Sequence, residues 1–600
     1  MMNHKKRSVP RLLSSVALAI ALAACSSNPQ QSEGLDISAQ PTQSVESYMI
    51  KADSSEGSQQ SDWLILAAKA ALAQGDWPLT QRLLVRINRS PMTPVQNAEY
   101  LLTQGQLNLE QGNNKAVVDQ LRFNAEMPIN REQQRRYHTM RAQAFQNLGD
   151  AFATNRELVA LSSYVDEQQQ ARLAEQIWNN FSGFNQQQLT ELPVKESEDI
   201  LDGWVQLAIY VNTLNNNLSQ LQNTLKHWLA ENSAHPAARY TPQDIVDILD
   251  MKIVRPKHTA LLLPLTGKYA PQAKLIRDGF IFAMTNDQNR DPEASVSVID
   301  TNLYSAAKIK QTLLENNIDF VVGPLTKDKV VELQQAMATD NTQIAALALN
   351  IPDQTDPGLQ MCYLSLSPEQ EASQAAKHLF KQGYRYPMII TPKGSFGQRV
   401  SQAFDKEWQK LSDTPVASES FGDTRSLQRD INKAFGLQDS RQRIALIERL
   451  VNQPLETQAR SRRDVDAVYI VSRSSELTLI KPFIDVAVNP DAKPPKLFAS
   501  SRSNDGSPSY EDLSNVSYSD IPLLITPDQN VKQQMSELWG QQSNMQKRLE
   551  ALGMDAYSLL DELPQMKVVN GHTFQGQTGL LSLGTDCVID RELTWSQFND

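Results

Sequence analysis

The chain has 600 residues, 40% of them hydrophobic, and carries 57 Lys and Arg against 68 Asp and Glu, a formal net charge of −11 at pH 7. This acidic balance disfavours nucleic acid and anionic lipid headgroups as main partners, because both are bound through clustered Lys and Arg. The length exceeds what a single hydrophobic core normally serves, so we expect two or more domains.

The first 24 residues have the pattern of a secretory signal peptide, a basic head followed by an apolar run from Leu12 to Ala23. The run is too short to cross a bilayer core of about 30 Å, which needs about 20 helical residues. We expect residues 1–24 to be removed. Four basic residues and no acidic one leave with them, so 53 Lys and Arg remain against 68 Asp and Glu, a net charge of −15.

The apolar run ends in Leu22-Ala23-Ala24-Cys25, which resembles the lipobox of bacterial lipoproteins and predicts lipidation of Cys25. The alternative is an ordinary cleavage site that happens to precede a cysteine. Several acyl chains on one cysteine hold a protein at a membrane almost permanently. By resemblance to lipoprotein sorting signals, Ser26 in place of Asp favours the periplasmic face of the outer membrane. This covalent lipid is the only cofactor we expect.

Residues 26 to about 60 are mostly Ser, Gln, Pro, Glu and Gly. They include too few apolar side chains to offset the entropy of ordering the chain. We therefore expect residues 25–60 to be the lipidated cysteine and a flexible tether.

A repeat with a step of 37 residues comes next. Two sets of residues recur at this step: Trp63, Tyr100 and Tyr137, and Gly75, Gly112 and Gly149. Each glycine precedes Asp or Asn, a pair that suits a helix end with positive φ and the turn after it. The pattern resembles a tetratricopeptide array, whose usual period is about 34. We expect a helical domain over residues 61–250, with the aromatic side chains packed between helical hairpins.

After Pro256, short apolar runs alternate with amphipathic stretches, which predicts parallel sheets with helices on both faces. The predicted strands are Thr259–Leu263, Ser295–Ile299, Phe320–Val322, Ile344–Leu349, Met388–Thr391, Ala467–Val471, Lys496–Ala499 and Leu523–Thr526. About 340 residues are too many for one sheet core, so we expect two lobes. The predicted fold class is a helical repeat domain followed by a two-lobed α/β domain.

Three motifs in this second part resemble the type I periplasmic binding-protein fold of solute receptors. Leu261-Leu262-Leu263-Pro264-Leu265-Thr266-Gly267 is similar to its opening strand and ligand loop. Phe320-Val321-Val322-Gly323-Pro324-Leu325 is similar to its third strand, and Phe574-Gln575-Gly576-Gln577-Thr578-Gly579-Leu580-Leu581 to its closing hairpin. The resemblance implies a domain over residues 256–600 with a cleft between its lobes.

Ligands of open α/β sheets bind beyond the carboxyl ends of the strands. The residues expected at such loops, and hence in the cleft, are Thr266, Gly267, Thr326, Ser365 and Phe396. For Gly267, turn geometry alone is the more economical explanation. The sequence shows no clear carboxylate and arginine set that would clamp an amino acid.

Cys362 and Cys587 are the two cysteines that remain besides Cys25. In an oxidising compartment they could pair across a long loop, which would constrain the unfolded chain by a few kcal/mol. Two separately buried thiols are the alternative.

The stretch from Thr424 to Arg463 departs from the receptor fold. Its apolar residues suggest an added amphipathic helix, namely Ile444, Ile447, Leu450 and Val451. Three arginines follow it, at Arg460, Arg462 and Arg463. A charge run of this kind is usually a solvated surface, and contact with a partner is the alternative.

The motifs that carry metal or covalent chemistry are missing. The seven histidines form no HExxH or HxxxH pattern, and the sequence holds no CxxC, no GxSxG elbow and no GxxxxGK[ST] phosphate loop. We therefore expect no metal site and no enzymatic activity.

The lipobox, the tether, the irregular helical repeats and the two-lobed domain together resemble the LpoA-type outer-membrane lipoproteins that activate penicillin-binding proteins. The resemblance covers nearly the whole chain but offers no motif that marks functional residues. It implies a regulator that stimulates a class A bifunctional peptidoglycan synthase of the inner membrane. The alternatives are a lipoprotein whose α/β cleft closes on a small molecule such as a cell-wall fragment and, more distantly, a wall hydrolase.

Overall fold

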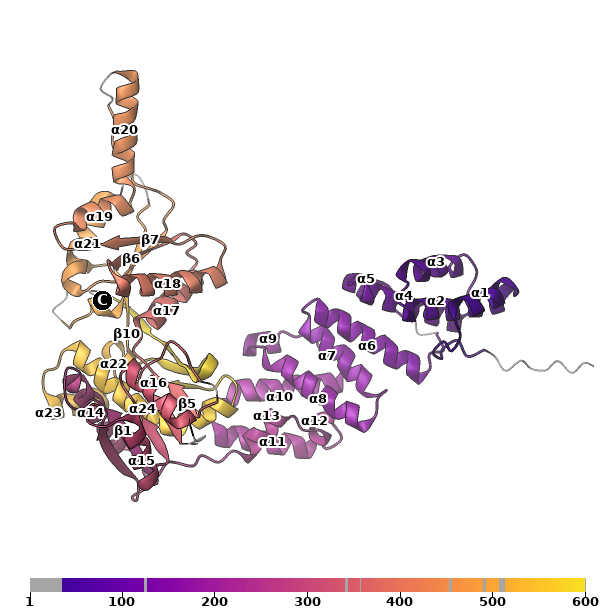
Figure 1. The fold of residues 1–600 in the computed structure, drawn as a ribbon, viewed down its shortest axis with the longest axis horizontal. Helices are drawn as coiled ribbons and strands as arrows, with labels where there is room; N and C mark the ends of the chain where they lie inside the picture. The colour runs from indigo at the N-terminus through magenta and orange to yellow at the C-terminus, as the bar shows by residue number, and fades with distance from the viewer. Residues whose placement is uncertain are drawn as a thin grey trace, which may run out of the picture. The chain divides into compact units, whose positions relative to one another are not determined.

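The computed structural model describes residues 35–598 apart from 124–126, 340–343, 357, 453–455, 489–492 and 507–512 (Figure 1). The signal peptide, Cys25 and the start of the predicted tether lie outside this range. The chain forms two compact units, one ending at Leu173 and one beginning at Ala174. We describe each unit by itself.

The first unit is helical. Its helices are α1 (Val45–Asp53), α2 (Gly57–Ala73), α3 (Trp77–Ile87), α4 (Pro94–Glu110), α5 (Asn114–Gln120), α6 (Arg131–Asn147), α7 (Ala151–Ser162) and the beginning of α8 (Glu167–Ser182). Helices α2, α4 and α6 begin 37 residues apart, and each is followed by a shorter helix that completes a hairpin. The predicted helical repeat is confirmed.

The glycine marker of the repeat ends the first helix of each hairpin. Gly75, Gly112 and Gly149 have φ of 75°, 75° and 77°, a left-handed conformation that glycine adopts without a Cβ clash. In two of the three hairpins the next residue caps the second helix through its side chain: Asp76 accepts a hydrogen bond from the backbone N–H of Leu79 at 3.0 Å, and Asp150 does the same for Ala153 at 2.9 Å. Asn113 makes no such bond.

The helical packing begins earlier than predicted. Residues up to 60 were expected to be a flexible tether, but Ile37 is buried and α1 packs against α2 through Val45 and Tyr48. The buried ammonium of Lys69 on α2 donates hydrogen bonds to the carbonyls of Ile37 at 2.9 Å and Ala39 at 2.7 Å. The composition of this segment is polar, yet a few apolar side chains and one buried cation order it.

The second unit begins inside α8, so the division differs from the boundary near residue 250 expected from the sequence. Its first helices are α9 (Gln186–Thr190), α10 (Asp199–Leu214), α11 (Leu218–Glu231), α12 (Pro236–Arg239) and α13 (Gln243–Asp250). The turn after α10 meets the chain after the long C-terminal helix: Asn215 Nδ2 donates to the carbonyl of Gly571 at 2.8 Å, and the N–H of Thr573 donates to Asn216 Oδ1 at 2.9 Å. These helices therefore belong with the α/β part.

The first lobe is a five-stranded parallel sheet in the order β2-β1-β3-β4-β5. Its elements are β1 (His258–Leu263), α14 (Ala270–Asn286), β2 (Ser295–Asp300), α15 (Ala306–Glu315), β3 (Phe320–Val322), α16 (Lys327–Ala338), β4 (Ala345–Ala348) and β5 (Met361–Tyr363). Leu261 and Leu263 face the core formed with α14, while Ala260 and Leu262 face the core formed with α15 and α16. Burial of both faces explains the continuous apolar runs of these strands.

The second lobe is a six-stranded sheet in the order β14-β10-β9-β8-β6-β7, parallel except for β14. Its elements are α17 (Pro368–Lys381), β6 (Pro387–Pro392), α18 (Ser395–Leu411), β7 (Ala417–Phe421), α19 (Leu427–Ala434), α20 (Leu437–Val451), β8 (Ala467–Ile470), α21 (Ser474–Ala487), β9 (Lys496–Ala499), β10 (Ser517–Asp520) and β14 (Thr594–Gln597). Helices α17 and α18 pack on one face of the sheet, and α19 and α21 pack on the other. The predicted two-lobed α/β domain is confirmed.

The chain crosses between the lobes after β5, after β10 and after the last hairpin. The segment between the second and third crossings holds α22 (Pro522–Ile525), α23 (Gln529–Trp539), α24 (Asn544–Val568) and an antiparallel sheet of β11 (Thr573–Gln575), β12 (Leu580–Leu583) and β13 (Ile589–Glu592). The predicted closing hairpin is therefore present. Helix α24 joins the core of the first lobe and crosses α14 closely: a Cβ on Gly279 would lie 2.0 Å from the carbonyl oxygen of Glu550.

One predicted strand is wrong. Leu523–Thr526 was expected to be a strand, but Pro522–Ile525 is a short helix. A short apolar run does not distinguish strand from helix, and Pro522 at the first helical position favours the helix. The sequence analysis also missed β5, β7, β10, β13 and β14.

Candidate functional site

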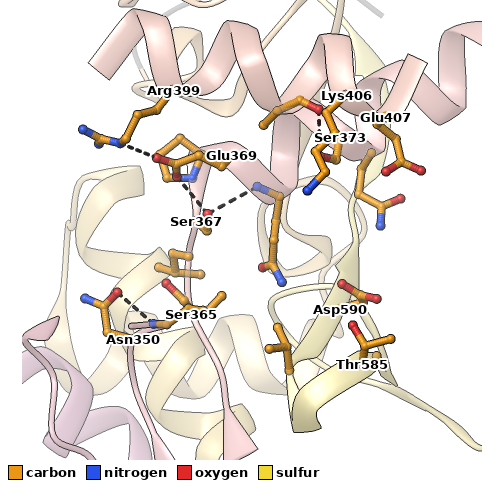
Figure 2. A pocket seen from close by; sticks show the side chains of 18 of the residues that line it. Asn350, Ser365, Ser367, Glu369, Ser373, Arg399, Lys406, Glu407, Thr585 and Asp590 are labelled. Carbon is orange, nitrogen blue, oxygen red and sulfur yellow. Dashed lines mark hydrogen bonds and ion pairs between the residues drawn. The ribbon is translucent and has the colours of Figure 1, made fainter. Parts of the chain in front are cut away.

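A cavity of about 790 Å³ opens between the two lobes (Figure 2). The first lobe contributes Lys327 and Asn350, and the antiparallel sheet contributes Thr585 and Asp590. The segment that crosses after β5 contributes Ser365 and Ser367. Helices α17 and α18 of the second lobe supply the other polar side chains: Glu369, Gln370, Ser373, Gln374, Lys377, Arg399, Lys406, Glu407 and Lys410.

Most charged groups of this cavity are already paired with one another. Arg399 Nε donates to Glu369 Oε1 at 2.8 Å, and Ser367 Oγ donates to Glu369 Oε2 at 2.9 Å (Figure 2). Partial burial opposes ionisation of Glu369, but these hydrogen bonds outweigh it and lower the pKa of the carboxyl group. Glu407 pairs with Lys410 at 2.7 Å and with Lys377 at 3.6 Å. The cavity is therefore polar but largely self-neutralised.

Asp590 differs from Glu369 and Glu407, because it forms no ion pair with another described residue. Burial raises the pKa of this carboxyl group, and the nearby charge of Lys377 only partly offsets the rise. Lys406 forms no ion pair within the part of the chain that the structure describes. A ligand in this cavity would therefore meet Asp590 and Lys406 without ion-pair partners from the described residues.

Of the five residues expected in the cleft, Ser365 lines the cavity. Thr326 directly precedes the lining residue Lys327 and is the N-cap of α16. Thr266 accepts a hydrogen bond through its carbonyl from Asn302 Nδ2 at 2.6 Å, and Gly267 has φ of 75°, so both shape the turn after β1. Neither lines the cavity.

Phe396 was expected in a loop but lies in the first turn of α18. Its ring packs against the core between α17, α18 and the sheet, and the guanidinium of Arg502 lies 4.7 Å from the ring centre. The sequence analysis missed Arg399, Lys406, Glu407 and Lys410, which stand on one side of α18. Their spacing along that helix was the signal that could have found them.

Cys362 on β5 and Cys587 are bonded as a disulfide in the structure, with Cα atoms 4.6 Å apart. The bond joins the edge of the first sheet to the turn between β12 and β13. Tyr363 and Val588 form a β-bridge beside it. The bond closes a stretch of 225 residues that contains the whole second lobe apart from β14.

No group of three or more His, Cys, Asp or Glu side chains that could hold a metal ion occurs among residues 35–598 as described. Across the same residues, no helix combines the length and apolar character needed to span a membrane.

The amphipathic helix expected between Thr424 and Arg463 is α20, which stands out from the rest of its lobe (Figure 1). Its apolar side chains are largely exposed: Leu446 by 57%, Ile447 by 48%, Leu450 by 76% and Val451 by 50%. None of them joins a core cluster of the described residues. Arginines accompany them at Arg441, Arg443 and Arg449.

The three arginines expected after this helix differ in their contacts. Arg462 pairs with Asp464 at 2.6 Å, and the N–H of Arg460 donates to Ser440 Oγ at 3.0 Å near the base of α20. Arg463 is exposed. The surface around α20 is thus apolar and basic in a chain that is acidic overall.

A helical repeat array joined to two α/β lobes is the architecture of a known lipoprotein class. The family model described as LppC putative lipoprotein matches residues 38–600, and the chain belongs to this family. Curated relatives carry a more specific name. The chain is 56% identical over 599 residues to the penicillin-binding protein activator LpoA of Vibrio antiquarius (strain Ex25), with 100% of this chain and 99% of the relative covered.

The protein of the same name from Vibrio vulnificus (strain YJ016) is 57% identical with the same coverage. Among solved structures, Haemophilus influenzae LpoA is similar with a TM-score of 0.69 and 24% identity, over 94% of this chain and 98% of that chain. At that identity the likeness shows a shared fold.

Proposed function

We propose that this protein is an outer-membrane lipoprotein that binds and activates a class A penicillin-binding protein, the bifunctional peptidoglycan synthase of the inner membrane. The identity of 56% to a protein named penicillin-binding protein activator carries the proposal. Because the alignment covers all of this chain, it includes both units. The partner is therefore assigned to the chain as a whole.

The membrane attachment in this proposal is a lipid on Cys25, exposed when residues 1–24 are removed. Since Ile37 is already packed, the folded part of the chain begins well before residue 60.

A protein that catalyses no reaction itself can still activate a synthase. It needs only to bind the active conformation of the synthase more tightly than the inactive one. A regulator of this kind needs a contact surface rather than a catalytic site. Helix α20 is the surface we assign to this contact. Apolar side chains with adjacent arginines are typical of the energetic centre of protein interfaces. Ile447, Leu450 and Val451 are 48%, 76% and 50% exposed and belong to no core cluster among the described residues.

An anionic membrane is a weaker partner for α20. Its three arginines are opposed by Asp439 and Glu448, so the helix carries a net charge of +1, and it has no Trp, Phe or Lys. Helices that lie in a membrane interface are usually richer in basic and aromatic residues. An apolar groove bordered by carboxylates on the synthase fits α20 better.

The test is direct binding of residues 26–600 to the detergent-solubilised class A synthase of the same organism. We expect saturable binding, and loss of binding in the double variant Ile447→Asp, Leu450→Asp. Absence of binding by the unaltered chain contradicts the proposal. Digestion of purified peptidoglycan by the chain alone would instead establish a hydrolase.

A further inference from the structure

A second cavity, of about 460 Å³, lies between the loops that follow β8 and β9 in the second lobe and the start of α24 in the first. Arg473, Ser474 and Ser475 line it from the loop after β8, and Ser501 and Arg502 line it from the loop after β9. These loops leave the carboxyl ends of neighbouring parallel strands. Loops at that edge of an α/β sheet are where ligands bind.

Four arginines line this cavity, and two of them are occupied within the protein. Arg548 forms a charge-assisted pair with the buried Asp520, with Nη2 and Nε at 2.5 Å and 2.9 Å from its two oxygens. Arg591 donates to the carbonyls of Ser365 at 2.7 Å and Thr578 at 3.2 Å, and lies in the field of the buried Glu371. Both arginines are structural.

Arg473 and Arg502 are the other two. Neither takes part in an ion pair among the residues that the structure describes. Arg502 is held against the ring of Phe396 with 4.7 Å between the guanidinium carbon and the ring centre. Partial burial, and next the positive charge of Arg473, lower the pKa of Arg502. Two cations therefore face each other. Two carboxylates, Glu371 and Asp505, line the same cavity, and Glu476 and Glu371 partly offset the charge of Arg502.

Further features at the same loops favour an anion. Helix α21 has 14 residues and begins at Ser474, so its free N–H groups and the positive end of its dipole lie beside Arg473. The hydroxyls of Ser472 and Ser500, exposed by only 1% and 2%, have no hydrogen-bond partner among the described residues. They precede Arg473 and Ser501 in the chain. Buried hydroxyls are rarely left unpaired without a reason.

The rest of the wall is apolar. Leu366, Ile521, Met545 and Leu593 line it from the segments that cross between the lobes and from α24. A bare inorganic ion would leave this surface exposed to water, whereas an aliphatic group would cover it at a gain of about 25 cal/mol per Å².

We propose that this cavity is a binding site for a small molecule that carries a carboxylate or phosphate group, with Arg473 and Arg502 holding the anion and the apolar wall holding an aliphatic body. The site is separate from the surface of α20. It connects the two lobes, so occupancy favours one arrangement of the lobes over others.

The test uses residues 26–600, without a synthase, and measures the thermal unfolding midpoint at increasing probe concentrations. The probes are N-acetylleucine in both enantiomers, the uncharged N-acetylleucinamide, and inorganic phosphate. We expect at least one enantiomer of N-acetylleucine, or phosphate, to raise the midpoint saturably, with no saturable rise for the amide. A rise with N-acetylleucine assigns the site to carboxylates, and a rise with phosphate alone assigns it to phosphates.

The double variant Arg473→Gln, Arg502→Gln should weaken the apparent affinity at least tenfold, and Arg502→Lys should weaken it less. The matched control Arg441→Gln, Arg443→Gln removes two positive charges from α20 and should leave the affinity unchanged. The proposal is overturned by no saturable rise with any charged probe, by an equal rise with the amide, or by unchanged affinity in the cavity variant. None of these results bears on binding of the synthase.

Discussion

Arg548 on α24 and Asp520 at the end of β10 form an ion pair that ties the first lobe to the second. Asp520 is completely buried and the Arg548 side chain is 12% exposed. Arg548 also donates to the carbonyls of Ser501 and Asn504 at 2.8 Å each. The guanidinium thus connects α24 to two loops of the other lobe.

Removing one partner of a buried pair leaves an uncompensated charge, which costs about 3–5 kcal/mol. We expect Arg548→Met to lower the free energy of unfolding by that amount in urea titrations. Lys327→Met removes an exposed pair with Asp353, whose side chains are 57% and 93% exposed, and should cost less than about 1 kcal/mol. Equal costs for the two variants would show that Arg548 does not hold the lobes together.

The disulfide between Cys362 and Cys587 closes a stretch of 225 residues. A bond across so long a loop restricts the unfolded chain and typically contributes about 2–5 kcal/mol. We expect the double variant Cys362→Ser, Cys587→Ser to unfold at lower urea concentration than the oxidised protein. Dithiothreitol should lower the midpoint of the unaltered chain and leave that of the variant unchanged. A variant as stable as the oxidised protein would contradict this role.

Glu550 on α24 is completely buried; Gln542 donates to one carboxyl oxygen, and the other has no partner among the described residues. Burial raises the pKa of Glu550 to about 7 from its ordinary value of 4.5. Because the folded-state pKa is the higher one, the stabilising contribution is complete below pH 4.5 and is lost as the pH rises through 7.

We therefore expect Glu550→Gln to raise the free energy of unfolding at pH 8 by up to roughly 3 kcal/mol and to have little effect at pH 4. Urea titrations at both pH values measure this. Burial also raises the pKa of Asp555, to about 6. The free energy of unfolding of the Glu550→Gln variant should therefore still fall with rising pH, but less steeply than that of the unaltered chain. If Glu550→Gln raised the free energy of unfolding as much at pH 4 as at pH 8, the raised pKa of Glu550 would be refuted.

Because the face of α20 is exposed, we expect substitutions there to reduce activation of the synthase without destabilising the fold. Ile447→Asp with Leu450→Asp alters side chains that are 48% and 76% exposed, so the unfolding midpoint should change by less than about 1 °C. Stimulation of the synthase should fall at least tenfold because a charge enters an apolar contact. Val486→Asp changes a residue of α21 that is 79% exposed and serves as the control. Full stimulation by the α20 variant would place the contact elsewhere.

The sequence predicted most of the scaffold because local patterns specify it. The 37-residue step and its glycines located the helical hairpins, and the apolar runs located β1, β3 and β6. Strands that the analysis missed are short or polar. Ser517–Asp520 has two serines and an aspartate, and the buried Ser519 and Asp520 hydrogen-bond to Glu371 on α17 and Arg548 on α24. No alternation of apolar and polar residues in the sequence predicts such a strand.

The sites were harder to predict than the fold. Ser365 was expected in the cleft and lines it, but Thr266 and Gly267 form a turn and Phe396 lies in a helix. Arg473 and Arg502 are 29 residues apart in sequence and meet only because β8 and β9 are neighbours in the sheet. Likewise, the ordering of residues 37–39 depends on Lys69, which a composition argument does not reveal.

The rate of lipid-linked precursor consumption by the purified class A synthase, measured with and without residues 26–600 of this protein, tests the central claim most directly. We expect the rate to rise several-fold and to saturate as the protein is added. An unchanged rate at concentrations where binding is complete would contradict the assignment of this chain as an activator.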